Sequence, residues 1–297
     1  MAAAAALARV AFCGLIAVLM LYCTMITSTR VEGILFSLVL VVLAMVAQLQ
    51  KWFAPAEMEH LQIDMVRRIP TTKLMSALTI DGVPFMREPS VLESLLDVMK
   101  ANDVKATLFV MSGFRMSEEM GGMDAASQQR CMDLLRRAVD EGHELGNQTQ
   151  FAEPLTDTTF ERSLEHCDAL LAELCGASWK ARPHRWHRPA AAPYTASMQN
   201  ISMKKKYTTV GTDFSPLYAM RCFAHVYLVR RARPGAILIV QDRWHSPATL
   251  AKALPEIASM GIKLTTLSEV QAAADAERLA NWKTFGHASM AGRFDQY

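Results

Sequence analysis

The stretch LTIDGVPF, residues 78–85, ends a short apolar strand on an acidic residue and continues into a turn. In proteins built from alternating strands and helices, chemistry gathers in the loops that follow the carboxyl ends of the strands. Asp81 therefore stands where a catalytic carboxylate is expected. Its neighbour Gly82 brings no side chain to the same place. This dipeptide decides whether the chain keeps a site or only the framework of one.

Outward from this stretch, short apolar strand candidates alternate with helical patterns. Alternation of this kind predicts parallel strands joined by right-handed crossovers. Seven units favour an α/β fold that forms an open or closed β/α barrel over a two-sided sheet. No glycine-rich phosphate loop follows the first strand, which argues against a nucleotide-binding sheet. The expected strands are residues 74–81, 105–113, 143–148, 185–189, 207–214, 236–242 and 262–270, and the clearest expected helices are residues 90–101, 126–141 and 159–174.

Polar residues follow several of these strands, and a parallel barrel brings the strand ends to one mouth. The set comprises Asp81, Gln148, Glu153, Arg188, Asp213, Gln241 and Asp242. Trp186 and Trp244 stand beside the same loops and offer flat faces that could stack on a sugar ring. Aromatic side chains at strand ends more often cap a core, so a packing role competes with sugar binding for both.

The amino-terminal fifty residues are not globular in pattern. Residues 10–27 contain no charge and approach the roughly 20 apolar residues that a helix needs to span a bilayer, and residues 33–49 form a second candidate. With both spanning, the excess of basic residues outside the hairpin places the globular domain in the cytosol. With one spanning, the domain is lumenal or extracellular. A cleaved signal peptide is disfavoured, because the apolar run is long and only Arg9 precedes it.

Composition excludes several classes of function. The formal net charge is +2, and the basic runs at residues 203–207 and 228–235 are typical of solvated helix ends, so no nucleic-acid partner is expected. The six cysteines show no C-x-x-C spacing and demand no oxidising compartment. The expected organisation is a membrane anchor at residues 1–50, a linker at 51–73, a barrel at 74–285 and a loose tail at 286–297.

Six segments in order carry a resemblance to a known family. They are ALTIDGVP, LLDVMKANDVKATLFVMSG, LLRRAVDEGHELGNQT, WHRP, RRARPGAILIVQD and LPEIASMGIKLTTLSEV. Together they resemble the polysaccharide deacetylases (carbohydrate esterase family four) over residues 74–270. The resemblance implies an irregular seven-stranded β/α barrel that removes acetyl groups from N-acetylated sugars. It also implies one metal ion, usually zinc, held by an aspartate and two histidines, which activates a water molecule.

Transferred position by position, the resemblance implies a damaged metal site. Asp81 matches the general base of the family. Gly82 stands at the position of the metal-binding aspartate, and Gln148 and Ala152 stand at the positions of the two histidines. Glycine and alanine have no donor atom, and an amide is a poor zinc ligand beside an imidazole. The scaffold segments persist while the ligand set is gone.

The remaining family positions are mixed. Arg188 matches the arginine that orients the base, and Asp213 could be its charge partner. Gln241 replaces the histidine that serves as general acid, and glutamine cannot exchange a proton near neutral pH. Asp242 beside it is kept.

Three hypotheses follow. The first is a membrane-anchored pseudoenzyme that binds a glycan or regulates a partner and needs no cofactor. The second is a working hydrolase of non-peptide carbon–nitrogen bonds, with zinc or another divalent ion on a new ligand set such as Asp81, Glu153 and Asp242. The third is a structural membrane subunit that uses the barrel as an interaction surface.

Overall fold

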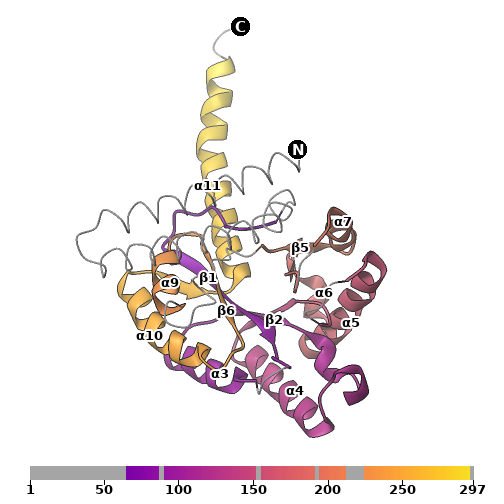
Figure 1. Ribbon diagram of the computed structural model, residues 1–297. Helices are drawn as coiled ribbons and strands as arrows, with labels where there is room; N and C mark the ends of the chain where they lie inside the picture. The colour runs from indigo at the N-terminus through magenta and orange to yellow at the C-terminus, as the bar shows by residue number, and fades with distance from the viewer. Residues whose placement is uncertain (1–64, 87–89, 152–154, 191–193, 212–223, 295–297) are drawn as a thin grey trace, which may run out of the picture. The chain divides into compact units, whose positions relative to one another are not determined.

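In the computed structural model, the described residues are 65–86, 90–151, 155–190, 194–211 and 224–294, with side chains described through residue 282 (Figure 1). The chain divides into two compact units, residues 1–62 and 63–297. The expected spans at residues 10–27 and 33–49 lie outside the described residues. Within the described part of the chain, no helix combines the length and apolar character needed to cross a membrane.

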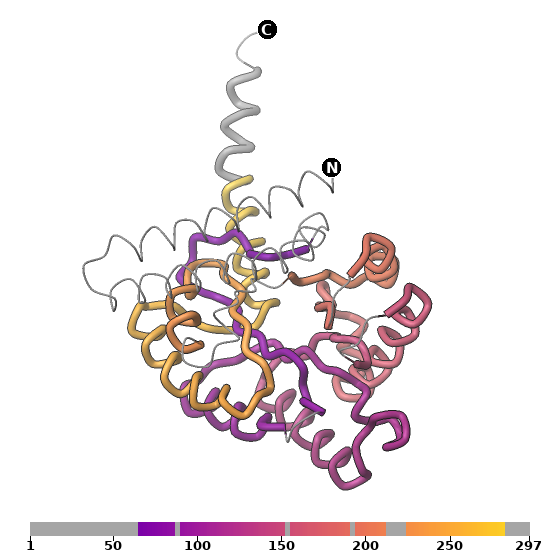
Figure 2. The backbone as a smooth tube through the Cα atoms, in the orientation of Figure 1, coloured from indigo at the N-terminus to yellow at the C-terminus, as the bar shows by residue number. Residues whose placement is uncertain are grey.

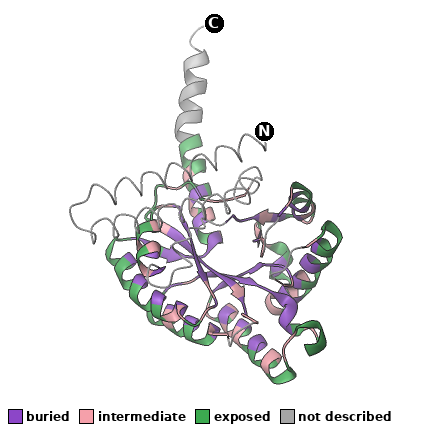
Figure 3. Ribbon diagram, in the orientation of Figure 1, coloured by how far each residue is buried: buried purple, intermediate pink, exposed green. Residues whose placement is uncertain are grey.

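The second unit is a parallel β/α barrel, as the alternation predicts. Its seven strands pair in the order β5-β4-β3-β2-β1-β6, with β7 added to the start of β1. Helices cover the outside of the strands, which are the most deeply buried part of the fold (Figures 1 and 3). The elements are β1 (Met75–Val83), α3 (Leu92–Ala101), β2 (Thr107–Val110), η1 (Ser112–Arg115), η2 (Glu118–Met120), α4 (Ala125–Asp140), β3 (Glu144–Asn147), α5 (Asp157–Cys175), α6 (Ser178–Ala181), β4 (Arg185–His187), α7 (Ala196–Lys204), β5 (Tyr207–Thr209), α9 (Ala224–Arg231), β6 (Ile237–Gln241), α10 (Ser246–Ser259), β7 (Lys263–Thr265) and α11 (Leu267–Phe294).

The strands divide their side chains between two cores because successive residues of a strand point to opposite faces. On β1, Leu78 and Ile80 join the large cluster beneath the helices. Ala77 joins the cluster inside the barrel, together with Phe109 and Trp186. Thr79 and Asp81 share the inward register of Ala77. The same alternation turns Gln148 inward on the chain that leaves β3.

Residues 66–69 close the barrel, which corrects their assignment to a linker. Val66 bridges Val210 at the end of β5, and Arg68 bridges Ala236 at the start of β6. The Ile69 amide donates to the Gly235 carbonyl at 2.9 Å, and the Ile69 side chain is fully buried. Two edges that the sheet leaves open are thereby joined, so the domain begins ahead of Leu74 (Figure 2).

Helix α11 replaces two expected features of the carboxyl terminus. The predicted strand at residues 262–270 ends at Thr265, and the helix begins at Leu267. The helix then continues to Phe294, where a loose tail was expected from residue 286. Its first turn is held by buried groups inside the barrel: the Leu267 amide donates to Thr107 Oγ1 at 2.9 Å, and the Ser268 amide donates to Glu144 Oε2 at 3.2 Å.

Closure by residues 66–69 leaves no room for a side chain at Gly235. A Cβ atom there would lie 1.8 Å from the Ile69 carbonyl oxygen, and the residue has a φ of +73°. We expect Gly235→Ala to lower the free energy of unfolding by about 3 kcal/mol or more, because steric overlap adds to backbone strain. Urea unfolding of the full chain measures this loss.

Gly121 provides the matched control, since it has a φ of +82° and no atom within 4 Å of a built Cβ. Gly121→Ala should cost only about 1 kcal/mol, the penalty of the left-handed conformation alone. Equal effects of the two substitutions would show that the contact between Gly235 and Ile69 does not stabilise the barrel.

Candidate functional site

A buried ion pair lies inside the carboxyl mouth of the barrel. Arg188 Nη1 donates to Asp81 Oδ1 at 2.5 Å and to Thr79 Oγ1 at 2.7 Å. The guanidinium lies 4.3 Å from the ring centroid of Phe109 and is fully buried, while Asp81 is 7% exposed. Burial raises the pKa of Asp81, whereas the charge of Arg188 and a hydrogen bond from Gln148 lower it. Asp81, which matches the general base of the family, and Arg188, which matches the arginine that orients it, are therefore in direct contact.

Gln148 and Gly82, which stand at two of the family's metal-ligand positions, are hydrogen-bonded to each other. The Gln148 side-chain Oε1 accepts a hydrogen bond from the Gly82 amide at 2.5 Å. The same side chain hydrogen-bonds to Asp81 and lowers the pKa of that carboxyl. Gln148 is 5% exposed. The amide thus takes up the space and the hydrogen-bonding capacity between residues that, in the resembled family, face the metal.

Gly82 itself keeps a backbone shape in which aspartate is tolerated. Its φ is +71°, and a built Cβ would meet only the Met111 side chain, at 3.6 Å. Asparagine and aspartate enter the left-handed region more readily than other non-glycine residues. A Cβ atom therefore fits at position 82, at the cost of the strain that a non-glycine residue has at a positive φ.

Asp242 serves the framework instead of a ligand, which corrects its assignment as a binding residue. It directly follows Gln241, so its side chain points to the opposite face of the strand. Its carboxylate accepts from the amides of Phe85 and Val91, each at 2.8 Å, and from Ser90 Oγ at 2.6 Å. Burial raises the pKa of Asp242, and these donors oppose that rise. The residue fixes the loop between β1 and α3.

The two tryptophans have opposite environments. Trp186 is fully buried inside the barrel, where its indole nitrogen donates to Ser268 Oγ at 2.9 Å, so it is not a sugar-stacking residue at the rim. Trp244 is 55% exposed and follows β6. Gln241 lies at the end of β6, directly opposite Asp81 in the strand register. Trp244 and Gln241 thus lie at the end of β6 that adjoins this mouth.

Several sequence-predicted positions lie outside the described residues, namely Ala152, Glu153 and Asp213. Within the described part, no group of three or more histidine, cysteine, aspartate or glutamate side chains is arranged to hold a metal ion. The donor set of the expected zinc site also does not fit. Gly82 has no side-chain donor, and the Gln148 carbonyl oxygen is already engaged by a backbone amide. The Asp242 carboxylate, considered above as a ligand of a relocated metal site, likewise already accepts three hydrogen bonds.

His187 is a neighbour of the site that the sequence does not mark. It is fully buried, and both ring nitrogens lack a hydrogen-bond partner among the described residues. Aromatic rings surround it, with centroids of Phe160 at 5.5 Å, Tyr194 at 5.8 Å and Tyr207 at 6.0 Å. Burial lowers the pKa of His187 to about 3, and the charge of Arg188 contributes. The residue packs as a neutral ring behind the ion pair.

Several solved structures share the fold of this barrel. The fold is similar to that of a CE4 family pseudoenzyme from Bacillus anthracis, with a TM-score of 0.56 and 18% identity over 70% of this chain and 69% of that chain. A mutant of that pseudoenzyme, described as having restored enzymatic activity, also matches with a TM-score of 0.56 and 18% identity, over 70% of this chain and 71% of that one. A peptidoglycan deacetylase from Bacillus subtilis matches with a TM-score of 0.53 and 17% identity over 71% of this chain and 95% of its own. The chain thus has the β/α-barrel fold that these proteins share.

Sequence comparison leads to the family itself. Residues 68–210 match the family model described as polysaccharide deacetylase. A peptidoglycan-N-acetylglucosamine deacetylase from Bacillus cereus is 26% identical over 216 residues, which span 68% of this chain and 90% of that protein. The chain carries a domain of the polysaccharide deacetylase family, as the six segments of the sequence predict.

The buried His187 should make stability depend on pH. In the unfolded chain the ring takes up a proton near pH 6.5, whereas the folded chain resists it until about pH 3. The unfolded state therefore binds more protons between these values, and stability falls as the pH falls from 6.5. One such group accounts for a loss of about 2 kcal/mol between pH 6.5 and 5.

We expect His187→Phe to remove this part of the pH dependence, because phenylalanine suits the aromatic surroundings and takes up no proton. Urea unfolding of the wild-type and variant full chains at pH 7.5 and pH 5 gives the comparison. The variant should be the more stable of the two at pH 5. An identical slope with pH in both chains would contradict a buried neutral His187.

Proposed function

We propose that this chain is a membrane-anchored polysaccharide deacetylase-like protein that has given up metal-dependent deacetylation and binds N-acetylated glycans through the carboxyl mouth of its barrel. The single observation that carries the proposal is the Gln148 side chain. Its amide lies between two of the positions that face the metal in the family and bonds to both Gly82 and Asp81. The charge of the Asp81 carboxylate is balanced by Arg188 in place of a metal ion, and the amide adds a hydrogen bond.

Relatives support both halves of the proposal. The Bacillus cereus relative is a peptidoglycan-N-acetylglucosamine deacetylase, and its name supplies the substrate class for this proposal. The Bacillus anthracis protein is a pseudoenzyme on the same fold. Loss of activity with retention of the barrel is therefore an outcome that this family already contains.

The glycan is expected to contact the rim that follows β6. Trp244 is more than half exposed there and offers an aromatic face. The guanidinium of Arg243 lies 3.7 Å from the ring centroid of Phe85, so a cation is held over the adjacent loop. Aromatic faces beside fixed polar groups are the usual composition of a small-ligand site.

Membrane attachment rests on the two apolar segments at residues 10–27 and 33–49, which are close to the length of a bilayer span. If both span, the barrel is cytosolic, and a glycan reached there would be a precursor. If one spans, the barrel faces outward and a wall glycan is within reach.

Metal content and acetate release separate the hypotheses. We expect the purified full chain to bind no stoichiometric zinc and to release no acetate from acetylated chitooligosaccharides. The same oligosaccharides should bind in calorimetry, with about a tenfold loss in Trp244→Ala, since stacking on an aromatic residue is worth about 1–3 kcal/mol. Stoichiometric metal with acetate release lost in Asp81→Asn would establish the altered-metal hydrolase instead.

A restoring variant tests the role of the replaced positions. Gly82→Asp combined with Gln148→His and Ala152→His should bind one zinc ion per chain, because it supplies the family's ligand types. The matched control retains Gln148 and changes only the other two positions, and should bind zinc far more weakly. Absence of both zinc and glycan binding from well-folded chains would favour the structural-subunit hypothesis.

A further inference from the structure

The end of the barrel opposite the candidate site carries a cluster of exposed cations. Because the strands are parallel, the residues that precede each strand meet at this end, which we call the amino-terminal rim. The exposed cations of this rim are Arg68, Lys73, Lys204, Lys206, Arg230, Arg233, Lys263 and Arg278. Along the part of the rim formed by α11 and the segments that precede β1, β5, β6 and β7, the acidic residues are fewer, namely Glu269, Asp275 and Glu277, whereas Asp103, Asp140 and Glu141 precede β2 and β3. This part of the rim is therefore more positive than the whole chain, whose formal charge is +2.

At least half of these cations have no acidic partner among the residues that the structure describes. Lys204, Lys206, Arg230 and Arg233 form no ion pair with any other described residue. The pairs that do occur involve exposed side chains: Lys263 lies 3.5 Å from Glu269, and Arg278 lies 3.0 Å from Asp275. Exposed pairs of this kind are weak, so these cations can exchange an acidic side chain for an external anion. The rim therefore presents positive charge that is open to an external anion.

Large apolar side chains are exposed on the same rim. Trp282 is 69% exposed, Leu74 and Met203 are each 58% exposed, and Leu279 and Met260 are 54% and 47% exposed. Elsewhere on the described surface, comparable exposure occurs only at Met120, Val226 and Trp244. Tryptophan and leucine interleaved with lysine and arginine are typical of proteins that sit at a membrane–water interface.

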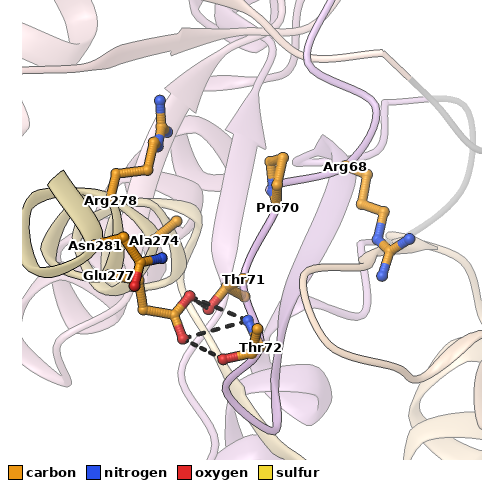
Figure 4. A pocket seen from close by; sticks show the side chains of 8 residues that line it. All are labelled: Arg68, Pro70, Thr71, Thr72, Ala274, Glu277, Arg278 and Asn281. Atoms are coloured by element: carbon orange, nitrogen blue, oxygen red, sulfur yellow. Dashed lines mark hydrogen bonds between the residues drawn. The ribbon is translucent and has the colours of Figure 1, made fainter. Parts of the chain in front are cut away.

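Helix α11 carries Trp282 and leaves the barrel at this rim (Figure 1). The helix is fixed there by Glu277, whose carboxylate accepts from Thr71 Oγ1 and Thr72 Oγ1, each at 2.6 Å (Figure 4). These groups lie in a recess of about 390 Å³ that is also lined by Arg68 and Arg278. Trp282 follows Glu277 by little more than one turn, so its position relative to the rim is set by this contact.

We propose that the amino-terminal rim lies against an anionic lipid surface, with Trp282 and Leu279 at the level of the headgroups and the cations over lipid phosphates. Charge complementarity selects the anionic lipid. Exposed tryptophan, leucine and methionine among the cations favour a bilayer over a nucleic acid or an acidic protein, because a bilayer alone offers phosphate and hydrocarbon together. The inference rests on the membrane attachment proposed above and adds which end of the barrel faces the bilayer. The candidate site then opens away from the membrane.

Quenching of tryptophan fluorescence by brominated acyl chains tests this orientation. The full chain is placed in nanodiscs that contain brominated phosphatidylcholine, with or without phosphatidylglycerol. With the anionic lipid present, we expect Trp282→Phe to remove a component of the quenching. Trp244→Phe is the matched control, since Trp244 is also more than half exposed but lies at the opposite mouth. It should leave the quenching unchanged.

Charge reversal provides the second arm. The pair Arg230→Glu and Arg233→Glu should abolish the component that depends on Trp282, whereas Lys252→Glu, an exposed lysine on α10, should not. Quenching that is equal in wild type and Trp282→Phe, in chains that enter the nanodisc, overturns this inference and leaves the anchor intact. A chain that does not enter the nanodisc overturns both. Quenching that is insensitive to phosphatidylglycerol and to charge reversal overturns the requirement for an anionic lipid.

Discussion

The ion pair between Arg188 and Asp81 constrains the rest of the site. Both groups are buried, and two further nitrogens of the guanidinium, Nε and Nη2, have no partner among the described residues. Removing either member leaves the other as an uncompensated buried charge, which typically costs about 3–5 kcal/mol. The pair therefore stays fixed while positions around it change. This explains how Gly82 and Gln148 can depart from the family pattern on a mouth that still holds the base and its arginine.

Inward alternation gives each end of the barrel its own group of buried polar side chains, with an apolar cluster inside the barrel as well. Arg188 bonds to Thr79 one layer below Asp81, and Thr79 Oγ1 in turn donates to the Leu238 carbonyl at 2.8 Å. At the opposite end Glu144 accepts from Thr107 Oγ1, at 2.8 Å, and from the first turn of α11. Buried polar groups are tolerated because each finds partners on neighbouring strands. The same strands thus position the candidate site and the helix that carries Trp282.

Sequence periodicity predicted the strands and helices of the barrel, because β1 and β6 are long apolar runs and the helices between the shorter strands show helical spacing. Residues 66–69 escaped prediction, since two arginines and a following proline carry no strand alternation, and only the open edges of β5 and β6 give the segment a partner. Trp186 was misplaced at the rim because β4 is only three residues long and its inward face is set by neighbouring strands. Asp242 was expected to point into the mouth, but its carboxylate accepts hydrogen bonds from the adjacent loop instead. The pairing of Asp81 with Arg188 followed from the family resemblance, whereas the contact between Gln148 and Gly82 required coordinates.

The contact between Gln148 and Gly82 makes the substitutions at these two former metal positions interdependent. An aspartate at position 82 without a metal ion would add a second carboxylate beside Asp81, and two neighbouring carboxylates disfavour each other's charge. A histidine at position 148 alone would withdraw the amide that bonds to Gly82 and Asp81 while gaining no metal. Each single reversal therefore loses an interaction before a metal ion can compensate for it. Interacting positions of this kind are expected to be strongly non-additive, so the present arrangement is stable against stepwise return to a metal site.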